Sequence, residues 1–264
     1  MRLMKKMLYT VMAAMTLFAV AACGGGSGSS GDSTQSSGTN DSTQSSGGSL
    51  SGVVIDGYWQ GAEVFMDFNG NFEHDENEPL VSTDAYGQYR FENLDNDSFG
   101  HPVVAKGTAG VTYDDGLGQY LTDNITMVSL DNDSMRVVSP FTSLHWYYMN
   151  NDNMTFEEAR NKVIEEFGLP SHQAVFEDFV EKSYDNTSYQ NMVNTSLRMG
   201  EYMGYYFSSD NSTTNMREEM MNGFTYMHQN VGWDNFTDDS FTPGMGMMRD
   251  NYPINGMPRM GMRN

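Results

Sequence analysis

Residues 62–91, AEVFMDFNGNFEHDENEPLVSTDAYGQYRF, decide the fold class of this chain. Apolar side chains recur at every second position at both ends of the stretch, and a strongly polar loop separates the ends. A period of two puts successive side chains on opposite faces of a strand. The stretch therefore predicts two strands joined by a loop. The alternating sets are Ala62, Val64, Met66 and Phe68 against Glu63, Phe65 and Asp67, and Tyr89 and Phe91 against Gln88, Arg90 and Glu92.

The same period extends from Gly52 to about Val138, and turn signals interrupt it at short intervals. Short strands at this spacing are typical of an antiparallel sandwich. We therefore expect residues 51–139 to form an antiparallel β sandwich. The turn signals are Asn69-Gly70, Tyr86-Gly87, Asp95-Asn96-Asp97, Asp115-Gly116 and Asp131-Asn132-Asp133.

Helical signals follow, and they predict a helical domain over residues 140–233. Thr155 and Glu158 have the spacing of a capping box, which opens a helix that should end at Gly168. The fold class predicted for the whole chain is therefore α+β, with the strands before the helices.

Further helices are expected downstream. Ser171 can cap a helix through about Lys182, and longer periodic stretches cover about 187–207 and 214–231. One face of the first long stretch carries methionines, which predict an adaptable core because the thioether side chain is flexible and apolar. The residues of this face are Met192, Met199, Met203 and Tyr206.

The loop between the first two strands has the oxygen pattern of a calcium site. In the twelve residues 67–78, oxygen-bearing side chains fall at positions 1, 3, 5, 9 and 12, and the twelfth is a glutamate. Calcium binds roughly six to eight hard oxygens and favours a closing carboxylate that binds through both oxygens. An acidic hairpin loop without metal is the alternative interpretation. The predicted ligands are the side chains of Asp67, Asn69, Asn71, Asp75 and Glu78, with the backbone carbonyl of Glu73.

Position six of such a loop is normally glycine, because the backbone turns sharply there. Here the residue is Phe72. The left-handed conformation costs a non-glycine residue about 1–2 kcal/mol. We therefore expect either that Gly70 or Asn71 takes up the turn, or that calcium affinity is reduced. On that basis a glycine at position 72 would strengthen the calcium effect.

The residues around the loop resemble a family of bacterial surface-protein β domains, the carboxypeptidase-regulatory-like or transthyretin-like modules. VFMDFNGN (64–71) and STDAYGQYRF (82–91) are similar to the loop and following strand of that family. The loop is also similar to dockerin and EF-hand calcium loops and to the B repeats of Gram-positive adhesins. VSPFTSL (138–144) resembles a junction to a helical segment in related lipoproteins. The resemblance covers about residues 52–145, departs from the pattern at Phe72 and Phe141, and implies a β fold and calcium but no activity.

The first 22 residues have the parts of a bacterial export signal. A basic start at residues 2–6 precedes an apolar run over residues 7–20, which is too short for the ~20 residues that span a bilayer. The tetrad Val20-Ala21-Ala22-Cys23 resembles the lipobox of bacterial lipoproteins. In that family the cysteine receives diacylglycerol and then a further acyl chain such as palmitate, so the resemblance implies that Cys23 anchors the chain in a membrane. Gly24 is not the aspartate that acts as an inner-membrane retention signal, and therefore favours the outer membrane.

Two further segments lack the pattern of a folded core. Residues 23–50 are rich in Gly and Ser, repeat DSTQSSG at 32–38 and 41–47, and predict a lipidated flexible tether. Residues 234–264 are rich in Met and Gly and predict a disordered tail. Because thioethers suit Cu(I), a copper site within Met245–Met262 is an alternative hypothesis.

Charge and motif content limit the classes of function that this chain can have. Without residues 1–22, the chain has 11 basic and 35 acidic residues and a net charge of about −24, which argues against nucleic acid as a partner. The sequence contains neither HExxH nor GxSxG, and its one cysteine is assigned to lipidation, so we predict no enzyme. We expect a surface-displayed, calcium-stabilised lipoprotein of the outer membrane that binds or adheres to an unidentified extracellular or periplasmic ligand. The alternative is a periplasmic copper-binding or copper-buffering lipoprotein that uses the Met-rich tail.

Overall fold

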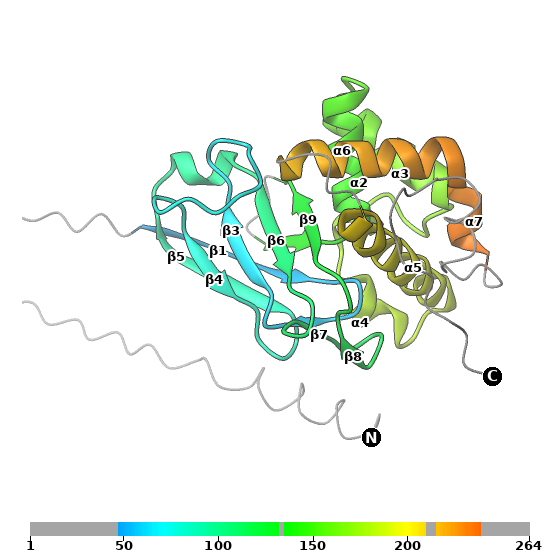
Figure 1. Ribbon diagram of the computed structural model, residues 1–264, viewed down its shortest axis with the longest axis horizontal. Helices are drawn as coiled ribbons and strands as arrows, with labels where there is room; N and C mark the ends of the chain where they lie inside the picture. The colour runs from blue at the N-terminus through cyan, green and yellow to red at the C-terminus, as the bar shows by residue number, and fades with distance from the viewer. Residues whose placement is uncertain (1–46, 132–134, 210–214, 239–264) are drawn as a thin grey trace, which may run out of the picture. The chain divides into compact units, whose positions relative to one another are not determined.

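The computed structural model describes residues 47–131, 135–209 and 215–238, with the backbone alone at 207–209, and these residues belong to one compact unit. Strands occupy one end of this unit and helices the other (Figure 1). Strands give way to helices at Pro140, so the predicted mixed α+β class is confirmed. The predicted leader 1–22, Cys23, most of the tether 23–50 and most of the tail 234–264 lie outside the described residues.

The described strands form three sheets. One sheet has the order β10–β1–β5, a second has the order β4–β3–β6–β9, and a small third sheet has the order β2–β7–β8. The strands are β1 (Gly48–Val54), β2 (Trp59–Gln60), β3 (Glu63–Met66), β4 (Leu80–Ser82), β5 (Gln88–Leu94), β6 (Val103–Gly107), β7 (Tyr113–Asp114), β8 (Gln119–Tyr120), β9 (Ile125–Ser129) and β10 (Met135–Val138), and a 3-10 helix, η1, spans Asp97–Gly100.

One strand pair departs from the predicted antiparallel pattern. β10 pairs with β1 in parallel, with Val137 opposite Val53 and Val138 opposite Val54. β9 lies at the edge of the four-stranded sheet, and β10 lies beside β1 in the other sheet. A parallel partner of this kind is reached by a crossover and not by a tight hairpin turn, so turn signals in the sequence do not reveal it.

The alternation predicted around the polar loop holds in β5 and fails in β3. Tyr89 and Phe91 are buried between exposed neighbours, as predicted. In β3, Phe65 is fully buried although the pattern placed it on the polar face. His74 covers this face at a ring separation of 5.7 Å from Phe65, and Lys106 Nζ lies 5.8 Å from the centre of the same ring. The loop that follows β3 therefore folds back over the outer face of the strand.

β1 begins at Gly48, four residues before Gly52, where the period of two was expected to start. The reason is Leu50, which is completely buried and pairs with Phe91 of β5. The last residues of the predicted tether thus belong to a strand.

The first predicted helix is confirmed at both ends. It spans Phe156–Phe167, is capped by a reciprocal Thr155–Glu158 box, and ends at Gly168 in the left-handed conformation. No helix of the described residues is long and apolar enough to cross a membrane. The helices are α2 (Pro140–Asn151), α3 (Phe156–Phe167), η2 (Ala174–Phe176), α4 (Phe179–Ser183), α5 (Thr187–Ser209), α6 (Met216–Tyr226), η3 (Met227–Val231, a π-helix) and α7 (Trp233–Thr237).

The continuous helix expected from Ser171 to about Lys182 is wrong. The structure has the short η2 and α4 in its place. Glu177 is extended at the end of η2, and the side chain of Asp178 caps α4 by accepting a hydrogen bond from Glu181 N. An aspartate favours such a cap over a helix interior because its carboxylate binds free N–H groups at a helix start.

α2 joins the strands to the helices through its first turn. Ser139 caps the helix in a reciprocal box with Thr142. Thr142 Oγ1 donates to Val128 O at 2.9 Å, and Val128 N donates to Ser143 Oγ at 2.9 Å. The start of α2 is thereby fixed on β9.

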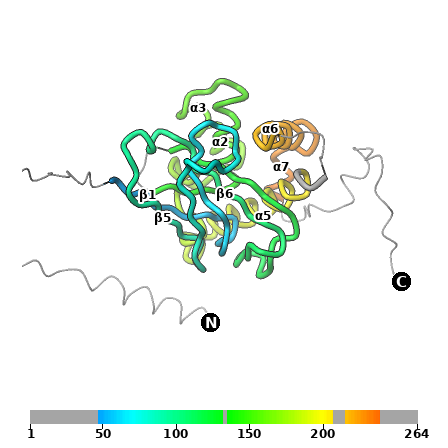
Figure 2. The backbone as a smooth tube through the Cα atoms, turned by 60° about the vertical axis from the view of Figure 1, so that its left-hand side comes forward, coloured from blue at the N-terminus to red at the C-terminus, as the bar shows by residue number. Residues whose placement is uncertain are grey.

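The view in Figure 2 also places α7 at the end of the molecule opposite β5.

The methionine face of α5 is buried, as the sequence predicted. Met192, Met199 and Met203 belong to the hydrophobic core of the described residues. The predicted tail begins too early at residue 234, because α7 continues to Thr237. Phe236 within α7 is completely buried and meets the ring of Tyr202 at 5.6 Å.

The pH dependence of stability should follow from His145. Burial lowers the pKa of His145 to about 4, and Nε2 donates to Phe156 O at 3.0 Å. Because the folded ring stays neutral while the unfolded ring takes up a proton near pH 6.5, acid favours unfolding. Stability should fall by up to about 1.4 kcal/mol per pH unit as the pH drops from about 6.5 toward 4.

Urea unfolding at about pH 7 and about pH 5 measures this loss. His145→Gln keeps a donor for Phe156 O and does not titrate, so this variant should lose less stability between the two pH values. Equal losses in both proteins would show that other groups are responsible.

Candidate metal centre

The predicted calcium loop, residues 67–78, connects β3 to β4, and hydrogen bonds to the neighbouring backbone hold its two ends. Met66 N donates to Pro79 O at 3.2 Å, and Asp67 N donates to Pro102 O at 3.0 Å. These hydrogen bonds therefore fix the position of the first loop residue, which directly follows the buried residues 64–66 of β3.

Asp67 organises the first half of the loop. Its side chain has no exposed surface. Asp67 Oδ1 accepts hydrogen bonds from Gly70 N at 2.7 Å and Asn71 N at 3.2 Å, and Oδ2 accepts one from Phe72 N at 3.1 Å. A buried carboxylate needs such donors because its desolvation is otherwise strongly unfavourable. The backbone of the loop thus curls around this carboxylate.

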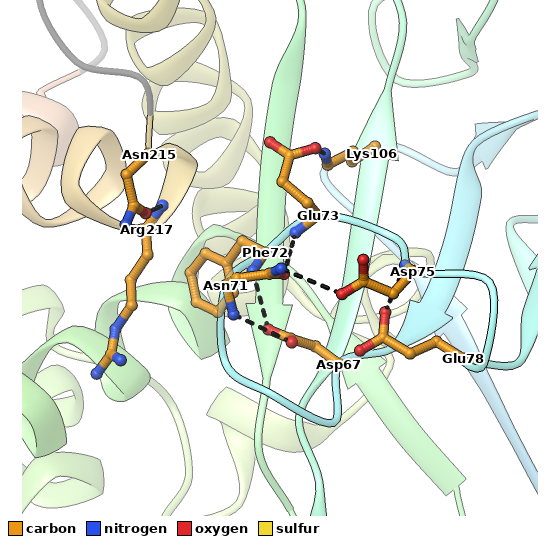
Figure 3. A network of polar contacts seen from close by, with 9 residues as sticks. All are labelled: Asp67, Asn71, Phe72, Glu73, Asp75, Glu78, Lys106, Asn215 and Arg217. Carbon is orange, nitrogen blue, oxygen red and sulfur yellow. Dashed lines mark hydrogen bonds and ion pairs between the residues drawn. The ribbon is translucent and has the colours of Figure 1, made fainter.

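Asn69 and Asn71 continue the pattern at alternate positions. Asn69 Oδ1 accepts from Asn71 N at 3.0 Å, and Asn71 Oδ1 accepts from Glu73 N at 2.7 Å. Their amide nitrogens both donate to Asp75 Oδ2, at 2.6 Å and 3.2 Å respectively. The side chains at positions 3, 5 and 9 therefore converge inside the loop, as Figure 3 shows for Asn71 and Asp75.

The side chain of Glu78 closes the loop, whereas the side chain of Glu73 points away from it. Glu78 is 5 % exposed, and its two carboxylate oxygens accept from Phe68 N at 2.7 Å and Asp75 N at 3.0 Å. Glu73 instead forms an ion pair with Lys106 at 2.7 Å, directed away from the other acids (Figure 3). The Glu73 side chain is thus engaged elsewhere, and a ligand role for its backbone carbonyl stays a prediction.

The donor set fits calcium in its chemistry. Hard oxygens come from side chains that face the inside of one short loop, which calcium prefers. Among the described residues, no three His, Cys, Asp or Glu side chains are close enough to hold a metal ion, so asparagine and backbone oxygens would have to complete the shell. A bound cation would replace the amides of Asn69 and Asn71 as the partner of Asp75.

Phe72 itself adopts the left-handed conformation at position six, with φ of 64°, and Gly70 also has a positive φ of 75°. Gly70 thus takes part in the turn, as one alternative expected, but it does not relieve Phe72 of the left-handed backbone. The other alternative, reduced calcium affinity, stays a prediction. The Phe72 ring is completely buried and lies 4.8 Å from the ring of Trp146 in α2. The guanidinium carbon of Arg217 in α6 lies 5.2 Å from the centre of the same Trp146 ring. Burial of the aromatic ring thus offsets the strain at its backbone.

These two partners of the loop were missed at the level of sequence. Trp146 and Arg217 lie on helices far from Phe72 along the chain, and no periodicity links them. The one available signal was the bulky residue at a glycine position. Such a residue requires a compensating contact when it keeps a left-handed backbone.

Two further aspartates among the strands stabilise turns. Asp84 Oδ1 accepts from Tyr86 N at 2.8 Å and Gln88 N at 3.0 Å. In the sequence Leu-Asp-Asn-Asp-Ser, which occurs at 94–98 and again at 130–134, Asp95 Oδ1 of the first copy accepts from Ser98 N at 2.9 Å, and the pKa of Asp95 is lowered by hydrogen bonds from Ser98. Residues 132–134 of the second copy lie outside the described residues.

A second set of acids is buried where α5 meets the strands. Asp114 Oδ2 accepts from Trp59 Nε1 at 3.1 Å, and Asp114 Oδ1 accepts from Gly116 N at 2.7 Å. Asp56 is 2 % exposed, and its Oδ1 has no hydrogen-bond partner in the described part of the chain. Burial, and then the nearby Asp114 charge, hold the pKa of Asp56 well above its ordinary value. Asp56 also packs closely against Gly200 of α5, where a Cβ would meet Asp56 Oδ2 at 1.9 Å.

No known protein family, curated protein or solved structure matches this chain. The likeness to carboxypeptidase-regulatory-like or transthyretin-like modules therefore rests on the motifs within residues 52–145. Cys23 and the copper candidate Met245–Met262 lie outside the described residues.

Replacement of Phe72 by glycine should destabilise the protein. Loss of a buried phenylalanine ring costs about 3–5 kcal/mol. Relief of the left-handed backbone returns only about 1–2 kcal/mol. We expect a net loss of about 1–4 kcal/mol by urea unfolding. The expectation that a glycine at position 72 strengthens the calcium effect concerns affinity and stays a separate prediction.

Asn93→Gly is the matched control, because Asn93 also has a positive φ of 59° but is exposed. It should leave stability unchanged or slightly higher. A Phe72→Gly variant as stable as the parent would contradict this balance, because relief of strain would then fully offset the lost packing on Trp146.

Proposed function

We propose that residues 67–78 bind calcium and that the cation stabilises a non-catalytic binding or adhesion module. The observation that carries this proposal is the fully buried Asp67 carboxylate, which accepts hydrogen bonds from the consecutive N–H groups of residues 70–72. This arrangement turns the side chains of Asn71 and Asp75 toward the inside of the same loop. Oxygen donors gathered by one backbone curl are what a flexible calcium shell requires.

Charge supports the same proposal. Asp75 and Glu78 lie close together, since Asp75 N donates to the Glu78 carboxylate, and Asn69 and Asn71 supply only neutral amides to Asp75. Acidic side chains that share a small space repel one another, and this repulsion is relieved by a divalent cation. The mature chain has no cysteine pair that could fasten the loop instead.

We further propose that the sheets β10–β1–β5 and β4–β3–β6–β9 are the two layers of a β sandwich. Support comes from the shared hydrophobic core, to which β1, β3, β5, β6 and β9 all contribute buried side chains. In this architecture the loop lies where β3 ends. A cation there stabilises the contact between this end of the sandwich and α2.

The remaining parts of the proposal rest on sequence. Lipidation at Cys23 would anchor the chain in the outer membrane, and the tether before β1 would hold the folded unit away from the lipid surface. Display toward the outside exposes the loop to millimolar calcium, which suits a site of modest affinity. Copper binding through the Met-rich tail stays the alternative prediction.

Calcium should raise the melting temperature of the full-length chain. A ligand that binds only the folded state stabilises it by about 2.7 kcal/mol at a hundredfold excess over Kd. For a Kd of about 10⁻⁴–10⁻³ M, about 10 mM calcium should give a clear shift by differential scanning calorimetry. Magnesium should give a smaller shift because it demands tighter octahedral geometry.

Two glutamate variants of the loop sharpen this test. Glu78→Gln should remove most of the calcium shift, because it takes away the closing carboxylate. Glu73→Gln is the matched control, since the Glu73 side chain points to Lys106 and only its backbone carbonyl is a proposed ligand. A melting temperature indifferent to about 10 mM calcium would leave the loop an acidic turn.

The anchor is tested at Cys23. Cys23→Ser removes the thiol that would carry the diacylglycerol, so incorporation of radiolabelled palmitate should be lost and cleavage after residue 22 should be blocked. Labelling as strong in the variant as in the parent would contradict the lipoprotein proposal.

A further inference from the structure

We infer that calcium in the loop controls the docking of α6, through a stack formed by Phe72, Trp146 and Arg217. The inference rests on the proposed calcium binding and adds what the bound cation does to the rest of the molecule. Three links carry it, from the ligand Asp67 to Phe72, from Phe72 to Trp146, and from Trp146 to α6.

The first link joins a proposed ligand to the position of an aromatic ring. Asp67 Oδ2 accepts from Phe72 N at 3.1 Å, and Phe72 has a φ of 64°. A phenylalanine keeps this conformation only where its surroundings hold it. A cation bound by Asp67 fixes the orientation of the carboxylate, and the carboxylate in turn fixes the peptide that directs the Phe72 ring.

The second link crosses from the loop to the helices. The rings of Phe72 and Trp146 are 4.8 Å apart and tilted by 58°, and Trp146 is 4 % exposed. Both rings are therefore buried against each other, and neither can move far without opening the contact. Interiors packed this closely transmit a displacement instead of absorbing it.

The third link brings in α6. Arg217, in the first turn of α6, lies over Trp146 at 5.2 Å and donates through Nη2 to Asn150 Oδ1 at 3.2 Å. Arg217 Nη1 also approaches the loop at Gly70. A Cβ built on Gly70 would lie 3.9 Å from this nitrogen. Figure 3 shows Arg217 extending from its helix beside the loop. Arg217 contacts the ring of Trp146 and the side-chain amide of Asn150. Both partners are uncharged, so neutralisation of the loop carboxylates by calcium leaves these contacts intact.

The two ends of α6 are held by different contacts. Near its C-terminal end, Thr225 Oγ1 lies 2.9 Å from Tyr147 Oη, and Phe224 packs on Tyr147 at 5.6 Å. Near its N-terminal end, Arg217 reaches Trp146 and Asn150. Calcium should therefore strengthen the docking of the first turns of α6. The last turn should not respond, because its contacts with Tyr147 hold it in place.

Coupling between two sites is reciprocal, so the effect can be measured from either side. Calcium should slow amide hydrogen exchange in the first turns of α6 more than in α3. In the other direction, Arg217→Gln should weaken calcium binding by about fivefold, although Arg217 is not a ligand. Isothermal titration with calcium chloride and hydrogen-exchange mass spectrometry on the full-length chain give the two readouts.

Arg160→Gln is the matched control for this variant. Arg160 is half-buried like Arg217 and lies over an aromatic ring, that of Phe156, at 5.9 Å, but it belongs to α3. It should change neither the calcium affinity nor the exchange of α6. Both arginines keep part of their surface in water, so the two variants should fold.

The outcomes separate this inference from the proposal beneath it. Absence of calcium binding in the parent chain would overturn the calcium site and the coupling together. Calcium binding with unchanged exchange in α6, and equal affinity in Arg217→Gln, would overturn the coupling and leave the calcium site standing. Slower amide exchange in α6 of the parent with calcium, together with weaker calcium binding in Arg217→Gln but not in Arg160→Gln, would support both.

Discussion

The carboxylate of Asp67 is fully buried at the point where β3 ends, and the local chain must supply donors for it. It obtains them by curling, so that three successive backbone N–H groups point at its oxygens. This curl turns the side chains of Asn71 and Asp75 inward and sets φ at Phe72. A single desolvation requirement thus determines both the donor set of the candidate calcium site and the place where the loop meets the helices.

Phe72 shows how strain and packing are balanced in this loop. Its left-handed backbone is unfavourable by about 1–2 kcal/mol. Burial of the ring against Trp146 is worth about 3–5 kcal/mol on the scale of phenylalanine truncations. Packing is therefore the larger effect, and it ties a surface loop to α2 and α6. The loop thus serves both as a candidate cation site and as one of the contacts that bind the strands to the helices.

Sequence reasoning succeeded where the relevant contacts are local. The capping box at Thr155, the stop at Gly168 and the alternation of Tyr89 and Phe91 depend on neighbours along the chain, and all were predicted correctly. In the loop, the amides of Asn69 and Asn71 reach Asp75, but no three acids or histidines among the described residues reach metal-binding distance, so the calcium ligands stay a prediction. The helix expected from Ser171 to about Lys182 failed because of a local cap at Asp178, and other failures came from contacts that have no periodic pattern. The parallel pairing of β1 with β10 and the burial of Phe65 under His74 leave no periodic trace in the sequence.

The presence of phenylalanine at position six bears on affinity in two opposing ways. Judged from the loop alone, the strain at Phe72 argues for weaker calcium binding. The packed ring, however, holds the backbone in the left-handed conformation, so the chain loses less conformational freedom when the cation arrives. A glycine at this position would remove the strain and also the pre-organisation, because glycine samples many more backbone conformations. If the loop binds calcium as proposed, its affinity should therefore depend on the docking of the helices as well as on the ligands.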